Sequence, residues 1–365
     1  MIPALLWLIE RLARTHDVRV FALRQEPRPA QWPLHGAIIE NVGQPCAVLR
    51  AIAAIRHQHA RTPFDLVHAI WGGACAMAGV AAARSLRIPS LVHLAGGELA
   101  ALPDIGYGGR LRLYRRAIDW WPLRNTNIIT AASEPIIAQA AALGFSASRV
   151  PLGVDLDAWP ALSPRARHLD APARMIHVAS LNRVKDQHTL LGAMERLAAR
   201  QVDFHLDVVG EDTLDGEIQR LAGRRRLGAR VTFHGFLTQR QLRPIMEAAH
   251  INLVSSRHEA GPLVVLEAAV AGVPTVGTAV GHVREWANDA AICVPVGDDA
   301  AFALGVQRLL EDDAERMRLA LEAQRRAIVE DADFTARSFE RCYSQLVTGL
   351  RGPGAAARSE PRAPN

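Results

Sequence analysis

Two glutamates eight residues apart, Glu259 and Glu267, stand in the stretch SSRHEAGPLVVLEAAVAG. Glu267 lies inside an apolar run, where burying a carboxylate is costly unless a partner offsets its charge. Between the two acids, Gly261 allows a tight turn and Pro262 suits the start of a helix. The first N–H groups of a helix that begins near Leu263 have no acceptor within it, so they form a site for an anion.

Carboxylates next to an anion site suit a ligand that carries sugar hydroxyls beside a phosphate. We expect Glu267 to accept hydrogen bonds from neighbouring hydroxyls such as those of a ribose, which would supply its partners on binding. We expect Glu259, at the tip of the loop, to do the same for a sugar ring beside the phosphate. The alternative is a surface glutamate together with a charge near a helix N-terminus. Two acids around a Gly-Pro helix start favour the functional interpretation.

The composition is that of a globular chain with two domains. Of the 365 residues, 49% are hydrophobic and 22% are charged, which is enough apolar material for two cores. The four cysteines lie far apart, without a CxxC pair or metal-ligand spacing, and this favours a reducing compartment. We therefore expect a cytoplasmic protein.

The net charge of +5 comes with clusters of arginine. One cluster holds Arg110, Arg112, Arg115 and Arg116, and residues 224–226 form another. Such patches suit phosphates, anionic lipid or nucleic acid, although a solvated helix face is the simpler interpretation. No aromatic residues alternate with the arginines, and no helix-turn-helix or zinc-finger spacing occurs, which argues against a nucleic-acid partner. The basic first half predicts peripheral contact with an anionic inner membrane surface.

Short β-rich runs alternate with helical patterns along both halves of the chain. In the first half, the runs VRVFAL, DLVHAI, SLVHLA and NIITAA predict buried strands at residues 18–23, 65–70, 90–95 and 127–132. This alternation predicts a parallel sheet with helices on both faces. The pattern pauses in a polar segment with several prolines, and we assign residues 161–173 to a linker.

The alternation then restarts in the second half. Six runs, RMIHVA, FHLDVVG, RVTFHG, INLVSS, PTVGT and AICVPV, predict a second parallel sheet. Helices are predicted around residues 187–199, 214–224, 238–249, 263–271, 299–310 and 313–328. We assign residues 1–160 to an amino-terminal Rossmann-like domain and residues 174–334 to a carboxyl-terminal one. A last helix at residues 335–350 is expected to pack back on the first domain, before a disordered tail at residues 351–365.

Two doubly wound domains leave a cleft at the carboxyl ends of their strands, where open α/β sheets bind ligands. The chain itself starts on a helix, since Leu5, Leu8, Ile9 and Leu12 fall at helical spacing. The strand and Gly-rich turn that normally open such a domain are not seen before it. Either the first strand of the amino-terminal sheet is missing, or the given start lies downstream of the true one.

Several stretches resemble one enzyme family. SSRHEAGPLVVLEAAVAGVPTVGT resembles the Glu-x7-Glu signature of the retaining, nucleotide-sugar-dependent glycosyltransferases of the GT-B fold, the family-4 type. VPLGVDLDAW resembles the passage into the second domain, and VASLNRVKDQHTLLGAM resembles its first strand and phosphate-binding helix. LDVVGEDTLDGEIQRLAGRRRLGARVTFHGFL and TAVGHVREWANDAAICVPVGDD resemble later segments, in the family's order. The resemblance covers nearly the whole chain and implies two Rossmann-like domains facing a central cleft.

The resemblance implies roles for the residues of the glutamate stretch. Glu259 matches the glutamate that contacts the transferred sugar, and Glu267 matches the one that binds the nucleotide ribose. Gly261, Pro262 and Leu263 match the turn whose N–H groups approach the sugar and phosphate.

Other donor-side residues follow from the same resemblance. Lys185 matches the lysine that neutralises the diphosphate. The family usually has an arginine five residues earlier, where this chain has Ser180, and the nearby Arg183 is the candidate for the second positive charge. The pocket for the base is expected to include Gly235 and Phe236.

The acceptor side departs further from the family pattern. The stretch HLAGGEL resembles a His-Gly-x-Asp element and places Gly96, Gly97 and Glu98 at the acceptor, but Ala95 occupies the place of the histidine. His93 lies two residues earlier and points to the same side of the strand. Two interpretations remain open: His93 substitutes as a catalytic residue, or it is a histidine of the core.

The function implied is transfer of a sugar from a nucleotide-diphosphate sugar to an acceptor, with retention of configuration. The acceptor would be a polysaccharide, a lipid-linked sugar or a small molecule. Lys185, Arg183 and the helix N-terminus offset the charge of the leaving diphosphate, and no metal-binding motif occurs, so neither a metal nor another cofactor is expected. Two alternatives remain, a nucleotide-sugar epimerase of the GT-B fold and a non-catalytic module that binds nucleotide sugars.

Overall fold

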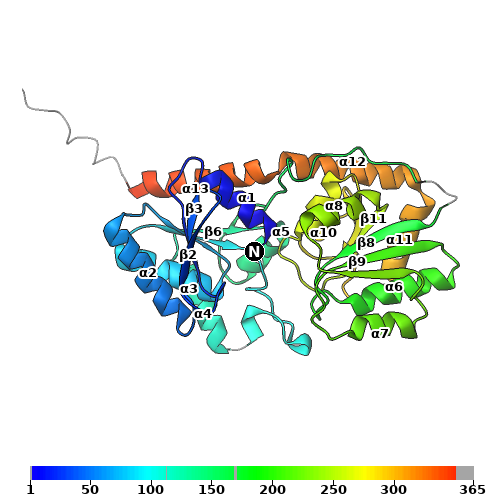
Figure 1. The fold of residues 1–365 in the computed structure, drawn as a ribbon, viewed down its shortest axis with the longest axis horizontal. Coiled ribbons are helices and arrows are strands. Elements are labelled where there is room, and N and C mark those ends of the chain that lie inside the picture. Colours follow the sequence, from blue (N-terminus) through cyan, green and yellow to red (C-terminus); the bar gives the residue numbers. More distant parts are fainter. Residues whose placement is uncertain (1, 112, 168–170, 351–365) are drawn as a thin grey trace, which may run out of the picture.

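The computed structural model describes residues 2–111, 113–167 and 171–350. Two α/β domains lie end to end along the long axis of the molecule, and the last helix runs back over the first domain (Figure 1). The predicted tail at residues 351–365 and Arg112 of the first arginine cluster lie outside the described residues.

The carboxyl-terminal domain is built on one six-stranded parallel sheet. Its strands are β8 (Ala173–Val178), β9 (Phe204–Val209), β10 (Val231–Gly235), β11 (Ile251–Val254), β12 (Thr275–Thr278) and β13 (Ala291–Val294). The spatial order β10-β9-β8-β11-β12-β13 confirms the predicted sheet. The order of connection reverses between β8 and β11, and ligands of such sheets bind at the reversal, outside the carboxyl ends of the strands.

The predicted helices of this domain are confirmed, because their apolar residues recur at helical spacing and face the sheet. They are α6 (Gln187–Ala199), α7 (Glu217–Arg224), α8 (Gln239–Ala248), α9 (Leu263–Val270), α11 (Asp299–Glu311) and α12 (Asp313–Val329). The described residues contain a further helix here, α10 (Gly281–Glu285), which was not predicted. Its five residues are too few for a periodic pattern to reveal.

The amino-terminal domain holds a four-stranded parallel sheet. The strands, in spatial order, are β4 (Val67–Ile70), β5 (Ser90–Leu94), β6 (Ile128–Ala131) and β7 (Ser148–Arg149). Helices α2 (Ala47–Arg61), α3 (Gly73–Leu86), α4 (Leu113–Asn125) and α5 (Glu134–Ala142) belong to the same domain. The strands predicted at residues 65–70, 90–95 and 127–132 therefore pair as expected.

The strand predicted at residues 18–23 does not join that sheet. It is β1 (Arg19–Ala22), which pairs in parallel with β3 (Ala37–Asn41), while β2 (Ala30–Leu34) pairs antiparallel with β3. The prediction of one parallel sheet is wrong here, because the β2–β3 hairpin was missed. Its turn is His35-Gly36, with φ of 49° and 80°, as a two-residue type I′ turn requires. Histidine is not one of the residues that usually mark the first position of such a turn, so the hairpin was not predicted.

The first and last described helices pack together on the amino-terminal domain. Helix α1 (Pro3–Leu12) lies against α13 (Ala332–Leu350). Their shared cluster also reaches β5, and its buried members include Leu8, Leu12, Leu91, Phe339 and Leu346. Helix α13 therefore covers one face of the amino-terminal sheet, although it follows the second domain in the chain.

The end of the predicted first domain packs against the second domain. Val154 and Trp159 were assigned to the amino-terminal domain, yet both are buried in a cluster with helices α8 and α9 of the carboxyl-terminal domain. The segment after residue 153 thus packs on the second domain before the predicted linker begins.

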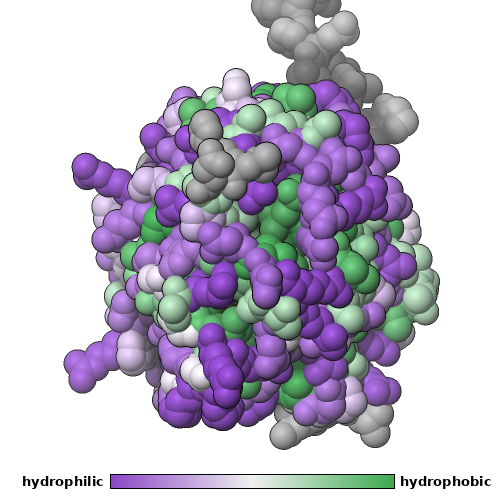
Figure 2. Space-filling view, turned by 90° about the vertical axis from the view of Figure 1, so that its right-hand side faces the viewer, coloured by the Kyte–Doolittle hydropathy of each residue, from purple (hydrophilic) through white to green (hydrophobic). Residues whose placement is uncertain are grey.

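The end of the carboxyl-terminal domain has a surface of mixed polarity. Seen from the end of the carboxyl-terminal domain, hydrophilic residues surround scattered apolar ones (Figure 2). None of the described helices is long and apolar enough to cross a membrane. The expected peripheral contact with a membrane surface stays a prediction.

Docking of α13 should depend on Phe339. Its fully buried ring contacts His68 and His93 of the sheet, with ring centroids 4.6 and 5.2 Å apart. Phe339→Ala leaves a cavity, so we expect the free energy of unfolding to fall by about 3–5 kcal/mol. Urea unfolding measures the loss. Ser344→Ala, on the exposed side of the same helix, is the control and should change stability by no more than about 0.5 kcal/mol.

Candidate functional site

The two halves of the predicted site meet at the carboxyl ends of β8 and β11, which are neighbours in the sheet. The loop at residues 179–186 leads from β8 into α6, and the loop at residues 255–262 leads from β11 into α9. Arg257 N donates to the Val184 carbonyl at 2.7 Å, which ties the two loops together. Residues from distant parts of the sequence thereby share one corner of the sheet.

Lys185 and Glu259 form the centre of this corner. Lys185 Nζ lies 2.5 Å from Glu259 Oε1, and both side chains are mostly buried. Ser256 Oγ donates to the same carboxylate oxygen at 2.6 Å, and Ser255 Oγ donates to the Lys185 carbonyl at 2.7 Å. The two serines therefore fix a charge-assisted pair in place before any ligand is bound.

Helix α9 begins beside this pair, with Pro262 as its N-cap and Leu263 as its first residue. The N–H groups of its first turn have no acceptor within the helix. Gly261 has no room for a side chain, since a Cβ would lie 3.0 Å from Ala132 and 3.0 Å from His282. This close packing explains why a glycine stands at the turn.

Glu267 is buried within α9, with 3% of its surface exposed. Gln239 Nε2 donates to Glu267 Oε1 at 3.0 Å, and Trp159 Nε1 donates to Gln239 Oε1 at 2.5 Å. The expectation that a ribose would supply its partners is therefore wrong in one respect, because a neutral amide already does so. Burial raises the pKa of Glu267 to about 7, and the bond from Gln239 offsets only part of that effect. Contact with a ribose stays a prediction.

An exposed aromatic ring stands where the base is expected. Phe236 follows β10 and is 74% exposed, which is unusual for a phenylalanine. Gly235 before it has φ of 68°, a conformation that favours glycine. Gly210 N, at the end of β9, donates to the Gly235 carbonyl at 2.8 Å and joins the two loops. The ring of Phe236 thus presents a face on which a base can stack.

Ser180 and Arg183, predicted to act beside Lys185, lie on the same loop, and each makes a contact of its own. The Ser180 carbonyl accepts a hydrogen bond from Gln187 Nε2 at 3.2 Å. The Arg183 guanidinium lies 3.4 Å from Glu217 of α7, and its side chain is 58% exposed. Arg183 therefore has to leave Glu217 before it can add positive charge at the phosphates, and that role stays a prediction.

His93 is a core residue rather than part of the cleft. Its side chain is fully buried, its Nδ1 lies 2.9 Å from Thr130 Oγ1, and its ring packs edge-on against Phe339. Burial lowers the pKa of His93 to about 3, so the ring is neutral. The catalytic interpretation of His93 is wrong in this structure, because strand alternation turns it, like Leu91, toward α13.

Gly96 and Glu98 follow the carboxyl end of β5, in the first domain. Glu98 Oε1 accepts from Gly72 N at 3.1 Å, and Glu98 Oε2 accepts from Gly96 N at 2.8 Å. Gly72 is the N-cap of α3, so the carboxylate holds the loops after β4 and β5 together. Glu98 therefore positions the predicted acceptor side, with each of its oxygens engaged by backbone.

Two residues that were not predicted, Arg257 and His258, join the two domains. Arg257 Nη1 lies 2.5 Å from Asp104 Oδ2, and His258 Nε2 lies 3.2 Å from the Gly96 carbonyl. Arg257 and His258 directly precede Glu259, and this adjacency was the signal available in the sequence.

Tyr107 was also missed. A Cβ on Gly97 would lie 2.5 Å from the Tyr107 hydroxyl, and the Tyr107 and His258 rings have centroids 5.9 Å apart. Burial, and then the charges of Glu259 and Glu98, raise the pKa of Tyr107 to about 12. Its hydroxyl therefore stays protonated near the charge of Glu259.

Two α/β domains built on parallel sheets, with a lysine–glutamate pair at the switch in strand order of the second, form the framework of a GT-B protein. The model for glycosyl transferases group 1 matches residues 163–326, and the model for Glycosyltransferase Family 4 matches residues 5–158. The chain belongs to the glycosyl transferases group 1 family. The family and the fold class expected from the sequence motifs are confirmed.

Two curated relatives are similar to most of the chain. Glycogen synthase of Mycobacterium tuberculosis is 27% identical over 254 residues, which cover 67% of this chain and 60% of the relative. The 2-deoxystreptamine glucosyltransferase of Streptomyces kanamyceticus is 25% identical over 324 residues, covering 84% of this chain and 83% of the relative. The chain thus spans about three fifths of the length of the glycogen synthase that it matches.

Solved structures share the fold along most of the chain. A sucrose-phosphate synthase from Thermosynechococcus elongatus has a TM-score of 0.78 and 20% identity, covering 94% of this chain and 92% of that one. The Anabaena HepE protein in complex with UDP-glucose has a TM-score of 0.74 and 19% identity, covering 94% and 96%. These likenesses show the two-domain GT-B arrangement.

The buried carboxyl of Glu267 should make stability depend on pH. Its pKa rises from 4.5 in the unfolded chain to about 7 in the folded protein. Between these values the folded protein holds a proton that the unfolded chain releases, so this group lowers stability as the pH rises from about 4.5 to 7. Glu267→Gln has no carboxyl group to titrate, so it does not lose this stability. We expect the difference in free energy of unfolding between variant and wild type to shift in favour of the variant from pH 4.5 to pH 8, by on the order of 3 kcal/mol.

Urea unfolding of both proteins at pH 4.5 and pH 8 measures this difference. Other titrating groups cancel, because each pH compares the variant with the wild type. If the stability difference between the two proteins is the same at both pH values, Glu267 does not titrate in this range and its burial has been misjudged.

Proposed function

We propose that the chain transfers a sugar from a nucleoside diphosphate sugar to a hydroxyl acceptor, with retention of anomeric configuration. The observation that supports this most is the Lys185–Glu259 pair beside the first turn of α9. It brings a cation, a carboxylate and helix N–H groups without helical acceptors to the switch point of a parallel sheet. A ligand with a diphosphate next to sugar hydroxyls uses all three.

In this proposal the donor lies along the carboxyl-terminal domain. The base stacks on Phe236, the ribose lies over Glu267, and the diphosphate lies between Lys185 and the first turn of α9. Glu259 then faces the hydroxyls of the sugar. Lys185 and the helix N-terminus stabilise the negative charge that develops on the departing diphosphate, and we assign this task to them rather than to a metal.

In the transfer step, the bond between the anomeric carbon and the diphosphate oxygen breaks, and a bond to the acceptor oxygen forms on the same face. The acceptor proton passes to the leaving diphosphate, so no side chain is needed as the base. The acceptor attacks directly, so no side chain acts as a covalent nucleophile. The acceptor approaches from the amino-terminal domain, past Gly96, Gly97 and Tyr107. It would be a polysaccharide, a lipid-linked sugar or a small molecule.

A thermal-shift panel of UDP-, ADP- and GDP-sugars tests the donor. UDP-glucose comes first, because the HepE structure contains it and one relative is a glucosyltransferase. A donor present at one hundred times its Kd adds about 2.7 kcal/mol of stability. Release of nucleoside diphosphate from a stabilising donor then separates turnover from binding. No stabilisation by any nucleotide sugar would overturn the proposal.

Lys185 should bind the phosphates of the ligand rather than its nucleoside. Lys185→Ala removes a charge-assisted contact worth about 1.5–3 kcal/mol, so the affinity for UDP should fall about 10- to 100-fold. Affinity for uridine should stay the same, because uridine carries no phosphate. Calorimetry with both ligands measures the two changes. Equal losses for UDP and uridine would show that Lys185 does not contact the diphosphate.

Glu259 should act on the sugar instead. Glu259→Gln removes the carboxylate that engages Lys185 in the unliganded protein, so Lys185 becomes free for the diphosphate. We expect UDP to bind Glu259→Gln as tightly as the wild type or more tightly, while the rate of sugar release or transfer falls. UDP calorimetry beside the turnover of UDP-glucose checks both. A clear loss of UDP affinity in this variant would place Glu259 at the nucleotide.

A further inference from the structure

The loop between β11 and α9 belongs to the carboxyl-terminal domain, yet its middle is held by the amino-terminal domain. The methyl group of Ala260 is buried in the core cluster of the first domain, together with Ile129 and Ile136. Ser133 Oγ donates a hydrogen bond to the Ala260 carbonyl. Ala260 directly follows Glu259, so the first domain supports the loop next to its predicted sugar contact.

Ser133 makes this contact instead of capping its helix. It is the N-cap residue of α5, and serine is common there because its oxygen accepts from the first N–H groups of the helix. In this structure the side chain makes no such capping bond. The hydroxyl is fully buried and donates across the domain boundary instead. Helix α5 therefore does not depend on this hydroxyl, whereas the buried Ala260 carbonyl uses it.

Gly261 is enclosed from both domains. A Cβ on this residue would lie 3.0 Å from Ala132 Cβ and 3.0 Å from His282 Nε2. Ala132 directly precedes Ser133, so one short segment of the amino-terminal domain covers two successive residues of the loop. These residues stand between Glu259 and the start of α9, and their position sets the direction of both.

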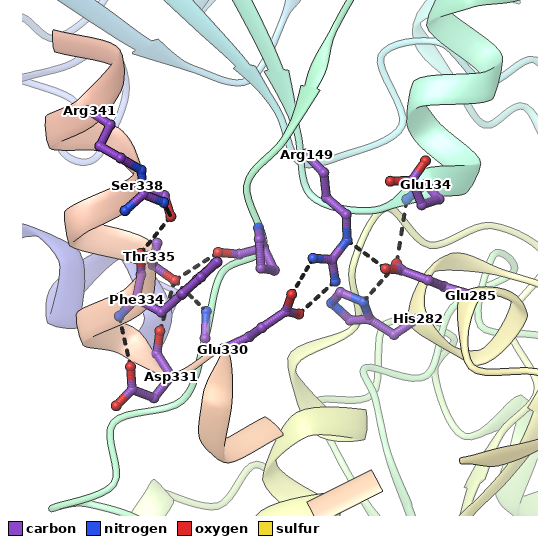
Figure 3. Close-up of polar contacts among 12 residues, drawn as sticks. Glu134, Arg149, His282, Glu285, Glu330, Asp331, Phe334, Thr335, Ser338 and Arg341 are labelled. Carbon is purple, nitrogen blue, oxygen red and sulfur yellow. Dashed lines mark hydrogen bonds and ion pairs between the residues drawn. The ribbon is translucent and has the colours of Figure 1, made fainter. Parts of the chain in front are cut away.

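His282 belongs to a series of contacts that ends at the crossing between the domains (Figure 3). Its Nδ1 lies 3.5 Å from Glu285 Oε2, and Glu285 Oε1 lies 2.5 Å from Arg149 Nε. The other two nitrogens of Arg149 donate to the two oxygens of Glu330 at 2.5 and 2.7 Å. Arg149 comes from β7 of the first domain, whereas Glu285 lies on α10 and Glu330 caps α12. The guanidinium thus fastens the two domains to each other.

Two chain crossings run side by side next to this arginine (Figure 3). Gly153 N donates to Thr335 Oγ1 at 2.8 Å, and that hydroxyl donates to the Pro151 carbonyl at 2.7 Å. Ala332 N donates to the Val154 carbonyl at 2.9 Å. These buried bonds hold the two crossings together.

We propose that Ser133 is a positioning residue for the donor. The amino-terminal domain holds Ala260 and Gly261 in their ligand-binding conformation, so the affinity for a nucleoside diphosphate depends on a side chain that lies behind the binding loop. The identity of the ligand rests on the proposed function. The hold on the loop rests only on the contacts described above.

Ser133→Ala tests the proposal, since it removes the hydroxyl without removing a helix cap. Ser85→Ala is the matched control, because Ser85 Oγ also donates to one backbone carbonyl, Ala82, in the same domain and far from the loop in sequence. Hydrogen exchange of the unliganded full chain should be faster for residues 255–262 in Ser133→Ala than in the wild type or the control. Calorimetry with UDP should show an affinity about three- to tenfold lower in Ser133→Ala only.

The outcomes separate this inference from the proposed function. Unchanged exchange of residues 255–262 in Ser133→Ala would overturn the inference, and so would faster exchange accompanied by unchanged UDP affinity. Faster exchange spread evenly over the carboxyl-terminal domain would also overturn it, since that result reports general destabilisation. If the wild type binds none of the nucleoside diphosphates while the exchange result holds, the proposed function fails and the hold on the loop stands.

Discussion

The pairing of β8 with β11 is the constraint from which the site follows. These strands are neighbours in space but lie on opposite sides of the switch in strand order. Their following loops therefore leave the sheet at one corner, and Lys185 on one loop meets Glu259 on the other. Each charge offsets part of the cost of burying the other, and Ser256 adds a hydrogen bond to the carboxylate.

The two glutamates of the signature both have mostly buried carboxyl groups, but their partners differ. Glu259 is held in direction by a cation and a serine hydroxyl. Glu267 has a neutral amide as its partner, and burial raises the pKa of its carboxyl to about 7. One acid thus has a cation as its partner, whereas the other has a neutral partner and a pKa of about 7. Their different surroundings support different tasks in one binding site.

Local patterns predicted the carboxyl-terminal domain well, because its helices and strands carry regular apolar spacing. The failures arise where a distant contact decides the outcome. Nothing near His93 in the sequence tells that α13 returns to cover its side of β5, and no local rule pairs Gln239 with Glu267. The β2–β3 hairpin was missed for another reason, since His35 occupies a turn position where asparagine or glycine is the usual signal. Fold class follows from local pattern, whereas the direction of a side chain depends on tertiary packing.

The amino-terminal domain also shapes a loop of the carboxyl-terminal domain. It places Ala260 within its own core, and the Arg149 contacts fix the angle at which it does so. The loop that would bind the donor is therefore shaped from behind by a domain that the donor need not touch. Under the proposed function, this packing links the two halves of the reaction, because the donor loop loses the support of Ser133 and of the core around Ala260 if the first domain moves away. Acceptor binding can then influence donor binding without any contact between the two substrates.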